Sequence, residues 1–212
     1  MTDVITIGSA TVDHFMTIEQ PFSSIKAGDK ILIKKAHMYS GGSASNAAAA
    51  LSTLGLKVKM LAKLGDDHDA EFILQEMKKY RVGNICSYRS KHHTDFSTII
   101  SSTKEKDRII YTFKEASRDL ELKDFKPQDL AASWLYIGSV MGKSFQIGKE
   151  IVQNTKSSVL FNPSLYLASK GMEVTGIDIS QKAIKICKIN ARQLGIENKI
   201  SFFRSTFPKG SL

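Results

Sequence analysis

The sequence has little of what disulfide-bonded, secreted or membrane-spanning proteins require. Its 212 residues include two cysteines, four prolines and one tryptophan. Cys86 and Cys187 lie in different predicted elements without metal-type spacing, which indicates two reduced, mostly buried thiols and no disulfide. No apolar run approaches the length of a membrane span, and residues 1–4 begin no leader of basic and then apolar residues. We therefore expect a cytoplasmic protein with no membrane partner.

The charge pattern of a nucleic-acid-binding protein is also absent, although the chain is basic. Thirty Lys and Arg against 21 Asp and Glu give a net charge of +9. The lysines are spread along the chain rather than clustered with aromatic residues, which favours a basic surface for small anionic ligands over a nucleic-acid partner. The length and a hydrophobic content of 42% suit one domain, or one domain with a small appendage.

Apolar runs and amphipathic segments alternate along most of the chain. The runs that fit a buried strand are 3–10, 57–64, 133–140 and 158–161, and the segments that fit a helix are 43–54, 70–80 and 145–155. Strand, helix and strand in succession imply parallel pairing through right-handed crossovers. The predicted fold class is α/β, with a mainly parallel Rossmann-like sheet flanked by helices.

Two further segments, about 14–36 and 95–113, alternate apolar and polar residues as strands with one wet face do. In the second, the polar residues 103–107 separate two β-branched runs, which is typical of a hairpin. These segments predict a small antiparallel lid, and its bare edges suggest a homodimer through the lid strands. His92 and His93 precede the hairpin without a third ligand at useful spacing, so we expect no metal site.

Residues 41–48, Gly-Gly-Ser-Ala-Ser-Asn-Ala-Ala, are the strongest candidate for a ligand site. Two adjacent glycines let the backbone approach a ligand, and the small residues after them open a helix whose first N–H groups would point at it. The glycine pair alone favours an ordinary turn before an Ala-rich helix. The wider spacing, with Asn46 and later Gly55 and Gly65, favours a ligand site.

Three carboxylates precede the helix expected at 70–80. Asp66, Asp67 and Asp69 could cap its start and complement its dipole. We favour this structural role most for Asp67 and Asp69, and less for Asp66.

The glycine and asparagine spacing resembles the first signature of the ribokinase, or PfkB, family of carbohydrate and nucleoside kinases. Residues 8–13, Gly-Ser-Ala-Thr-Val-Asp, are similar to that family's acidic motif after the first strand, and residues 161–164 resemble a later strand end. The resemblance covers about residues 1–164, the N-terminal half of such a kinase with its lid.

This resemblance implies a substrate and the residues that bind it. Asp13, Asn46 and the backbone at Gly41 and Gly42 would orient the hydroxyls of a sugar or nucleoside. ATP and Mg²⁺ are implied in the same way, as the family's phosphoryl donor and metal.

The family's catalytic segment does not occur in these residues. In the family, a Gly-Ala-Gly-Asp segment supplies the aspartate that takes the acceptor's proton and the N–H groups that stabilise the transferring phosphoryl group. Neither this segment nor a Walker-type loop is present, so we assign no catalytic residue. We expect a truncated or chimeric kinase relative, weakly active or inactive, and the alternative is a non-catalytic chimera or sugar-binding remnant.

Residues of about 165–205 resemble a piece of a class I S-adenosylmethionine-dependent methyltransferase. The resemblance implies that Asp178, at a strand end, would hold the ribose hydroxyls of that cofactor. Residues 161–163, Phe-Asn-Pro, stand where the glycine-rich loop of such a site should be, and Phe161 is expected to be buried. We therefore expect 165–212 to be a βαβ segment that completes the main sheet, with a methyltransferase fragment as the other alternative.

Overall fold

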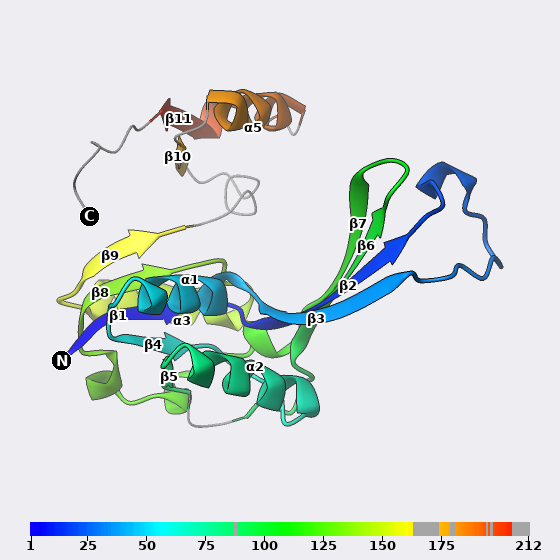
Figure 1. The fold of residues 1–212 in the computed structure, drawn as a ribbon. Helices are drawn as coiled ribbons and strands as arrows, with labels where there is room; N and C mark the ends of the chain where they lie inside the picture. Colours follow the sequence, from blue (N-terminus) through cyan, green and yellow to red (C-terminus); the bar gives the residue numbers. More distant parts are fainter. Residues whose placement is uncertain (87–88, 163–173, 179–180, 194, 196, 205–212) are drawn as a thin grey trace. The chain divides into compact units, whose positions relative to one another are not determined.

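The structure, a computed structural model, describes residues 1–86, 89–162, 174–178, 181–193, 195 and 197–204 (Figure 1). The contacts between residues fall into two compact units, Met1–Asn162 and Pro163–Leu212. Each unit is described by itself. No helix within the described ranges has the length and apolar character needed to cross a membrane.

A five-stranded parallel sheet forms the centre of the first unit (Figure 1). In spatial order its strands are β5 (Gly83–Asn84), β4 (Val58–Leu61), β1 (Thr2–Ile7), β8 (Ala132–Ile137) and β9 (Ser158–Phe161). All neighbouring pairs are parallel, which requires crossover connections between them. The predicted α/β class with a mainly parallel sheet is confirmed.

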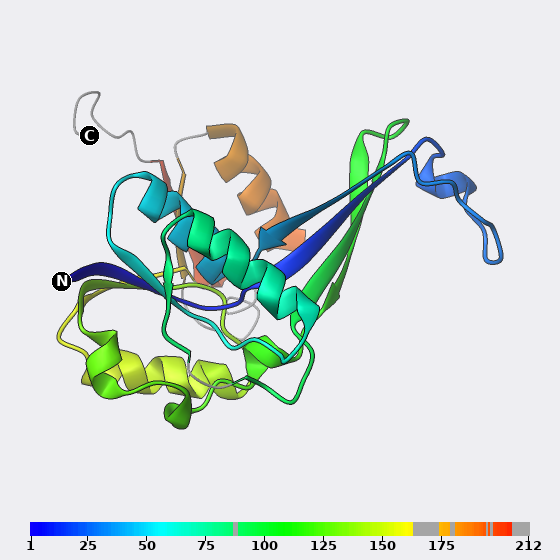
Figure 2. The ribbon, with the colours of Figure 1, turned by 60° about the horizontal axis from the view of Figure 1, so that its bottom comes forward.

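Helices cover both faces of this sheet. Helices α1 (Ser43–Thr53) and α2 (His68–Lys79) lie on one side, and α3 (Lys143–Asn154) lies on the other with short 3₁₀ turns (Figure 2). Because successive side chains of a strand point to opposite faces, each strand supplies both cores. Met60 of β4 packs with Ile73 of α2, whereas Ile5 and Ile7 of β1 pack with Ile151 of α3.

Strand β9 lies at the edge of the sheet and is not the buried strand that the sequence predicts. Among the described strands it pairs only with β8, and the side chains of Leu160 and Phe161 are 57% and 40% exposed. The apolar run in the sequence predicts a strand. Whether that strand is buried depends on how many other strands pair with it.

The lid is a second, four-stranded sheet that projects from the first unit (Figure 1). Its strands, in the order β3-β2-β6-β7, are β3 (Lys35–Gly41), β2 (Thr11–Ile18), β6 (Asp95–Ser102) and β7 (Asp107–Phe113). The pairs β2–β3 and β6–β7 are antiparallel, while β2 and β6 are parallel. The lid is therefore present, with one parallel pair in its middle.

The third strand of the chain lies mostly beyond the alternating segment of about 14–36 that predicts it. Strand β3 runs from Lys35 to Gly41, where Gly41 pairs with Thr11 and Lys35 pairs with Thr17. Most of its side chains are exposed, so burial leaves no periodic pattern in its sequence. Pairing with β2 decides where this strand lies.

The second unit contains a parallel β–α–β arrangement. Strands β10 (Val174–Asp178) and β11 (Ile200–Arg204) pair in a two-stranded sheet, and α5 (Gln181–Gln193) connects them. Cys187 on α5 is exposed, so the expectation of a mostly buried thiol is wrong there. That residues 165–212 complete the main sheet, and that they resemble a methyltransferase, both stay predictions.

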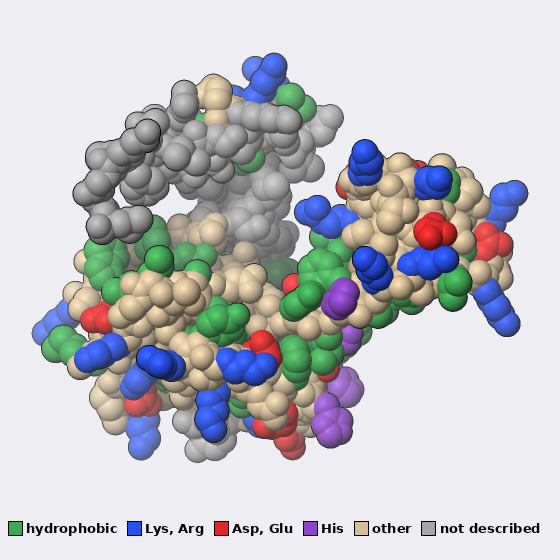
Figure 3. Space-filling model, in the orientation of Figure 1, with side chains coloured by type: hydrophobic (Ala, Val, Ile, Leu, Met, Phe, Trp, Pro, Cys, Tyr) green, Lys and Arg blue, Asp and Glu red, His purple; other side chains and the backbone are tan. Residues whose placement is uncertain are grey.

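Positive side chains are spread over the face of the molecule that Figure 3 draws. Figure 3 shows Lys and Arg scattered over the face that it draws, on the lid and beside the main sheet, with acidic side chains among them. This distribution agrees with the scattered lysines of the sequence. That nucleic acid is not a partner stays a prediction.

Candidate functional site

The carboxyl ends of β1 and β8 meet the start of helix α1. Gly8 follows β1, and Gly138 follows β8 with its N–H donating to the carbonyl of Ile7 (2.8 Å). Strand β2 begins nearby at Thr11, and β3 ends at Gly41 just before α1. Ligands of parallel α/β sheets bind outside the carboxyl ends of the strands, so the candidate site lies at this edge.

Asp13 and Gly41, two of the predicted site residues, lie in direct contact. A Cβ atom at Gly41 would be only 2.0 Å from Asp13 Oδ2, so the carboxylate lies over the Gly41 backbone. The Thr11 hydroxyl, which faces the same side of β2, donates to Asp13 Oδ1 (3.1 Å). The half-buried carboxylate is thus held in one orientation, which a glycine at 41 permits.

Gly42, the third predicted residue, brings two backbone segments together. It is the N-cap of α1 with φ of 104°, a value that favours glycine. A Cβ atom there would lie 2.5 Å from the Ser9 carbonyl oxygen and 2.7 Å from Ala10 Cα. The loop after β1 is therefore packed directly against the glycine pair.

The first N–H groups of α1 are already occupied. The Ser43 N–H donates to Ser9 Oγ (3.2 Å), and the Ala44 N–H donates to the Ser9 carbonyl (2.9 Å). The expectation that the helix start presents its N–H groups to a ligand is wrong for these two donors. Ser9 satisfies them because the helix packs on the loop after β1.

Asn46, the fourth predicted residue, lies in the first turn of α1. Its N–H donates to the Gly42 carbonyl (3.1 Å), and its side chain is exposed. Within the described residues, no hydrogen bond of its side-chain amide appears. This amide can therefore both donate to and accept from a bound hydroxyl.

A second group of carboxylates holds the base of the lid. Asp67 caps α2 by accepting from the Ala70 N–H (2.9 Å), and it also accepts from the N–H and hydroxyl of Thr94 (both 2.7 Å). Burial alone would raise the pKa of the Asp67 carboxyl, but the hydrogen bonds from Thr94 and Ala70 outweigh it and keep that pKa below its usual value. The predicted capping role of Asp67 is confirmed.

Asp95, which no sequence motif marks, secures the other side of the lid base. It is fully buried and accepts from the N–H groups of Glu115 (2.9 Å) and Ser117 (3.2 Å), with Lys114 Nζ at 3.4 Å. Its position before a predicted strand was compatible with a turn. Only the folded chain shows the carboxylate turned inward.

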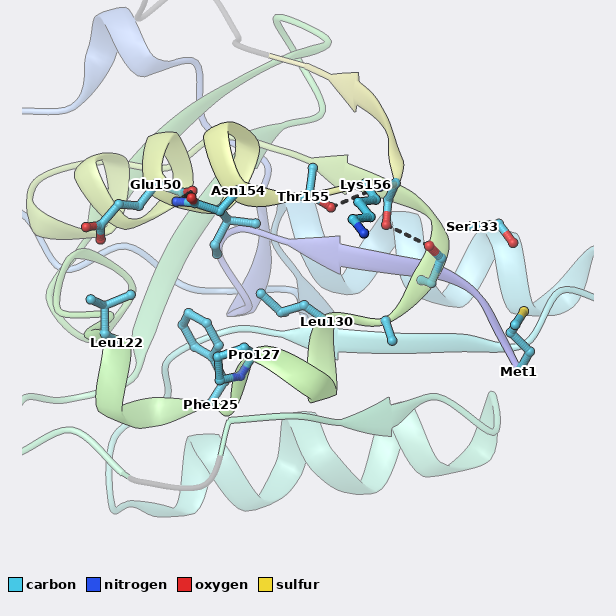
Figure 4. Close-up of a pocket in the computed structure, with 14 residues that line it drawn as sticks. Met1, Leu122, Phe125, Pro127, Leu130, Ser133, Glu150, Asn154, Thr155 and Lys156 are labelled. Atoms are coloured by element: carbon cyan, nitrogen blue, oxygen red, sulfur yellow. Dashed lines mark hydrogen bonds between the residues drawn. The ribbon is translucent and has the colours of Figure 1, made fainter.

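Another hollow lies away from this group, between α3 and two 3₁₀ turns (Figure 4). Its volume is about 730 Å³, and Leu122, Phe125, Leu130 and Ile151 line its apolar part. It lies where the strands start, and it shares no lining residue with the Asp13 group. We therefore assign the candidate site to the opposite edge, where the glycine pair and Asp13 converge.

Comparison with known proteins identifies relatives among sugar kinases. The sequence model of the pfkB family carbohydrate kinases matches residues 1–165. Ribokinase of Bacillus subtilis is 31% identical over 120 residues, which are 57% of this chain and 40% of the relative. 5-Dehydro-2-deoxygluconokinase of Clostridium perfringens is 23% identical over 205 residues, which are 93% of this chain and 52% of the relative. The chain spans about half or less of the length of these curated relatives.

Solved structures show the same fold. Ribokinase from Thermotoga maritima has a TM-score of 0.69 at 14% identity, with 96% of this chain and 72% of that chain covered. Arabidopsis thaliana ribokinase complexed with ribose and ATP has a TM-score of 0.64 at 16% identity, with the same coverage. At these identities the likeness establishes the ribokinase-like fold and nothing finer.

Proposed function

The chain belongs to the pfkB family of carbohydrate kinases, and from this premise we propose that its first unit binds a sugar or nucleoside as acceptor of a phosphoryl group from ATP. The observation that carries the proposal is the Asp13 carboxylate held against the Gly41 backbone, at the carboxyl edge of the sheet. A fixed carboxylate is suited to adjacent hydroxyl groups, because both of its oxygens accept hydrogen bonds.

Each residue of the site has a part in holding such an acceptor. Asp13 accepts from two hydroxyls, while Thr11 holds the carboxylate in place through its own hydroxyl (3.1 Å). Asn46 reaches a further hydroxyl from the first turn of α1. Gly41 and Gly42 present backbone with no side chain in the way. Together these groups would orient the reacting hydroxyl, which lowers the entropy cost of phosphoryl transfer.

We propose that this chain alone transfers phosphate slowly or not at all. Its 212 residues contain no Gly-Ala-Gly-Asp segment to supply the general base and the N–H donors. Each of these contributions is typically worth a factor of about a hundred or more in rate. A sugar-binding protein without catalysis is therefore the second candidate.

ATP with Mg²⁺ would supply the phosphoryl group and neutralise its charge. In the described part of the chain, no three His, Cys, Asp or Glu side chains lie close enough together to hold a metal ion. The described residues therefore do not provide a Mg²⁺ site of their own.

Calorimetric titration with D-ribose tests the binding site. We expect wild-type binding with a dissociation constant of about 1 mM, because only part of a kinase pocket is present. Asp13→Ala should weaken binding at least about tenfold, since a hydrogen bond to a charged group is lost. The control is Asp107→Ala, a lid carboxylate that accepts from the Arg108 N–H (2.8 Å), which should bind as wild type.

Equal binding by the Asp13 variant and the wild type would remove the site assignment. An assay of ADP release with ribose and ATP separates the two candidates, because a non-catalytic sugar-binding protein binds ribose without releasing ADP.

A further inference from the structure

The side chain of Ser43, the first residue of α1, joins three segments. Its Oγ accepts from the Ser9 N–H (3.2 Å), lies 3.3 Å from Ser9 Oγ, and donates to the Ser139 carbonyl (3.4 Å). Ser9 follows β1, and Ser139 follows β8. One hydroxyl therefore connects the start of α1 to the carboxyl ends of two neighbouring central strands.

Two glycines make the room for this hydroxyl. A Cβ atom at Gly8 would lie 2.5 Å from Ser43 Oγ, and one at Gly138 would lie 2.5 Å from Oγ and 2.6 Å from Cβ. These separations are far shorter than a van der Waals contact, so the side chain of Ser43 fills a slot between the strand ends. A small hydroxyl side chain both fits the slot and satisfies the polar groups around it.

The slot adjoins the glycine pair of the candidate sugar site. Ser43 follows Gly42 in the sequence, and Gly41 carries the Asp13 carboxylate over its backbone. Any shift of the start of α1 moves the glycine pair, and the contact between Gly41 and Asp13 then changes. Misplacement of binding groups by about 1 Å is enough to lower the activity of a site strongly.

We propose that Ser43 is a positioning residue of the sugar site, which acts through Gly41 and Gly42. The inference rests on the proposed function, since it names the group that holds the sugar-binding backbone in place. In this proposal the Ser43 hydroxyl does not touch the sugar, because it fills the slot between the strand ends and is engaged by Ser9 and Ser139.

The alternative is that Ser43 only docks the helix. Ser52, at the other end of α1, provides a matched control, because its hydroxyl donates to the Tyr80 carbonyl (2.5 Å). Ser43→Ala removes the hydrogen bonds of its hydroxyl to Ser9 and Ser139, and Ser52→Ala removes the one to Tyr80, so both should lower the melting temperature. Only Ser43→Ala should also disturb Gly41 and Gly42 of the sugar site.

The experiment combines ribose titration with amide hydrogen exchange in the full chain. Ser43→Ala should weaken D-ribose binding about five- to tenfold, while Ser52→Ala stays close to wild type. In the absence of ribose, exchange at the Gly41 and Gly42 amides should also become about tenfold faster in Ser43→Ala alone. Equal ribose affinity and equal exchange in the two variants would overturn the proposal.

The exchange measurement separates this proposal from the proposed function. If the wild type binds no ribose, the ribose site is wrong, and the exchange rates of Gly41 and Gly42 still decide the role of Ser43. If Ser43→Ala does not fold, amide exchange in the wild type tests the role of Ser43 instead. Ribose should slow exchange of the Ser9 amide, which donates to Ser43 Oγ, and an unchanged rate in bound protein would contradict the proposal.

Discussion

At the scale of single residues, the contact between Gly41 and Asp13 gives the glycine its role. The Asp13 carboxylate lies where any side chain at position 41 would stand. The glycine therefore provides space, whereas Gly42 provides both space and a backbone conformation with φ of 104°. The two adjacent glycines are not interchangeable, because they meet different neighbours.

Gly41→Ala should displace the Asp13 carboxylate. The new Cβ would lie 2.0 Å from Asp13 Oδ2, so we expect ribose affinity to fall at least about tenfold and stability to fall by about 1–3 kcal/mol. Gly148→Ala in α3 is the control, because the nearest atom to its new Cβ is Val140 Cγ2 at 3.7 Å. That variant should gain about 0.5–1 kcal/mol and keep its ribose affinity. Normal ribose binding by Gly41→Ala would contradict the geometry of the site.

Asp67→Ala should lower stability in a way that depends on pH. The variant loses a helix cap and two hydrogen bonds to Thr94, so we expect a loss of about 2 kcal/mol at neutral pH in urea unfolding. The pKa of Asp67 is lower in the folded chain than in the unfolded chain, where it is about 3.9. The stabilisation is therefore complete above about pH 4 and is lost as the pH falls through the folded pKa.

The difference between wild type and Asp67→Ala should accordingly shrink in acid. Asp69→Ala, in the first turn of the same helix, is the comparison, since it removes only an interaction with the helix dipole. Its loss should be about 0.3–1 kcal/mol. If the difference in unfolding free energy between wild type and Asp67→Ala stays constant down to low pH, the Asp67 carboxylate is not the stabilising group.

At the scale of elements, the end of β9 bears on the methyltransferase alternative. The Asn162 N–H donates to the Ile137 carbonyl (2.7 Å), and its side-chain amide donates to the Tyr136 hydroxyl (3.1 Å). The backbone donor that precedes Pro163 is thus used within the sheet. Phe161 is 40% exposed, so the used backbone donors, and not burial of Phe161, disfavour a cofactor loop at this turn.

S-Adenosylmethionine should leave the melting temperature unchanged. Asp178 ends β10, and its side chain lies outside the described residues. A single ribose contact there would not offset the entropy cost of holding the cofactor. A saturable rise in melting temperature that Asp178→Ala abolishes would contradict this prediction, because only binding to the folded chain produces such a shift.

At the scale of the whole molecule, the lid presents two open faces and two open edges. Large apolar side chains are exposed on both faces, among them Tyr39, which is 55% exposed, and Ile110 and Tyr111, which are 47% and 60% exposed. Strands β3 and β7 form the edges. Such surfaces favour association, so we propose that two chains pair through the lid.

Light scattering at high concentration should show a dimer. The double variant Ile110→Glu with Tyr111→Glu places a charge on each face of the lid and should be monomeric, because successive strand residues point to opposite faces. Leu122→Glu, which changes a side chain of similar exposure (54%) outside the lid, should remain dimeric. A monomeric wild type would rule the lid dimer out.

The amino-acid pattern alone was sufficient for the α/β class, the helix at Ser43–Thr53, the hairpin near 95–113 and the cap at Asp67. Each of these depends on periodicity, turn chemistry or capping within a few neighbouring residues. The resemblance to the ribokinase family, carried by these motifs, named Asp13, Gly41, Gly42 and Asn46 as site residues. Their roles in binding stay a proposal, because a local pattern indicates chemistry without placing a ligand.

Other features needed the folded chain, because they depend on segments far apart in the sequence. Pairing with β2 placed β3 at Lys35–Gly41. Strand β9 lies at the edge because, among the described strands, it has β8 as its one neighbour. Ser9 took the N–H groups at the start of α1, which the glycine pair alone suggested were open. The slot that Ser43 fills exists only where β1 and β8 end side by side, so no local pattern could have predicted it.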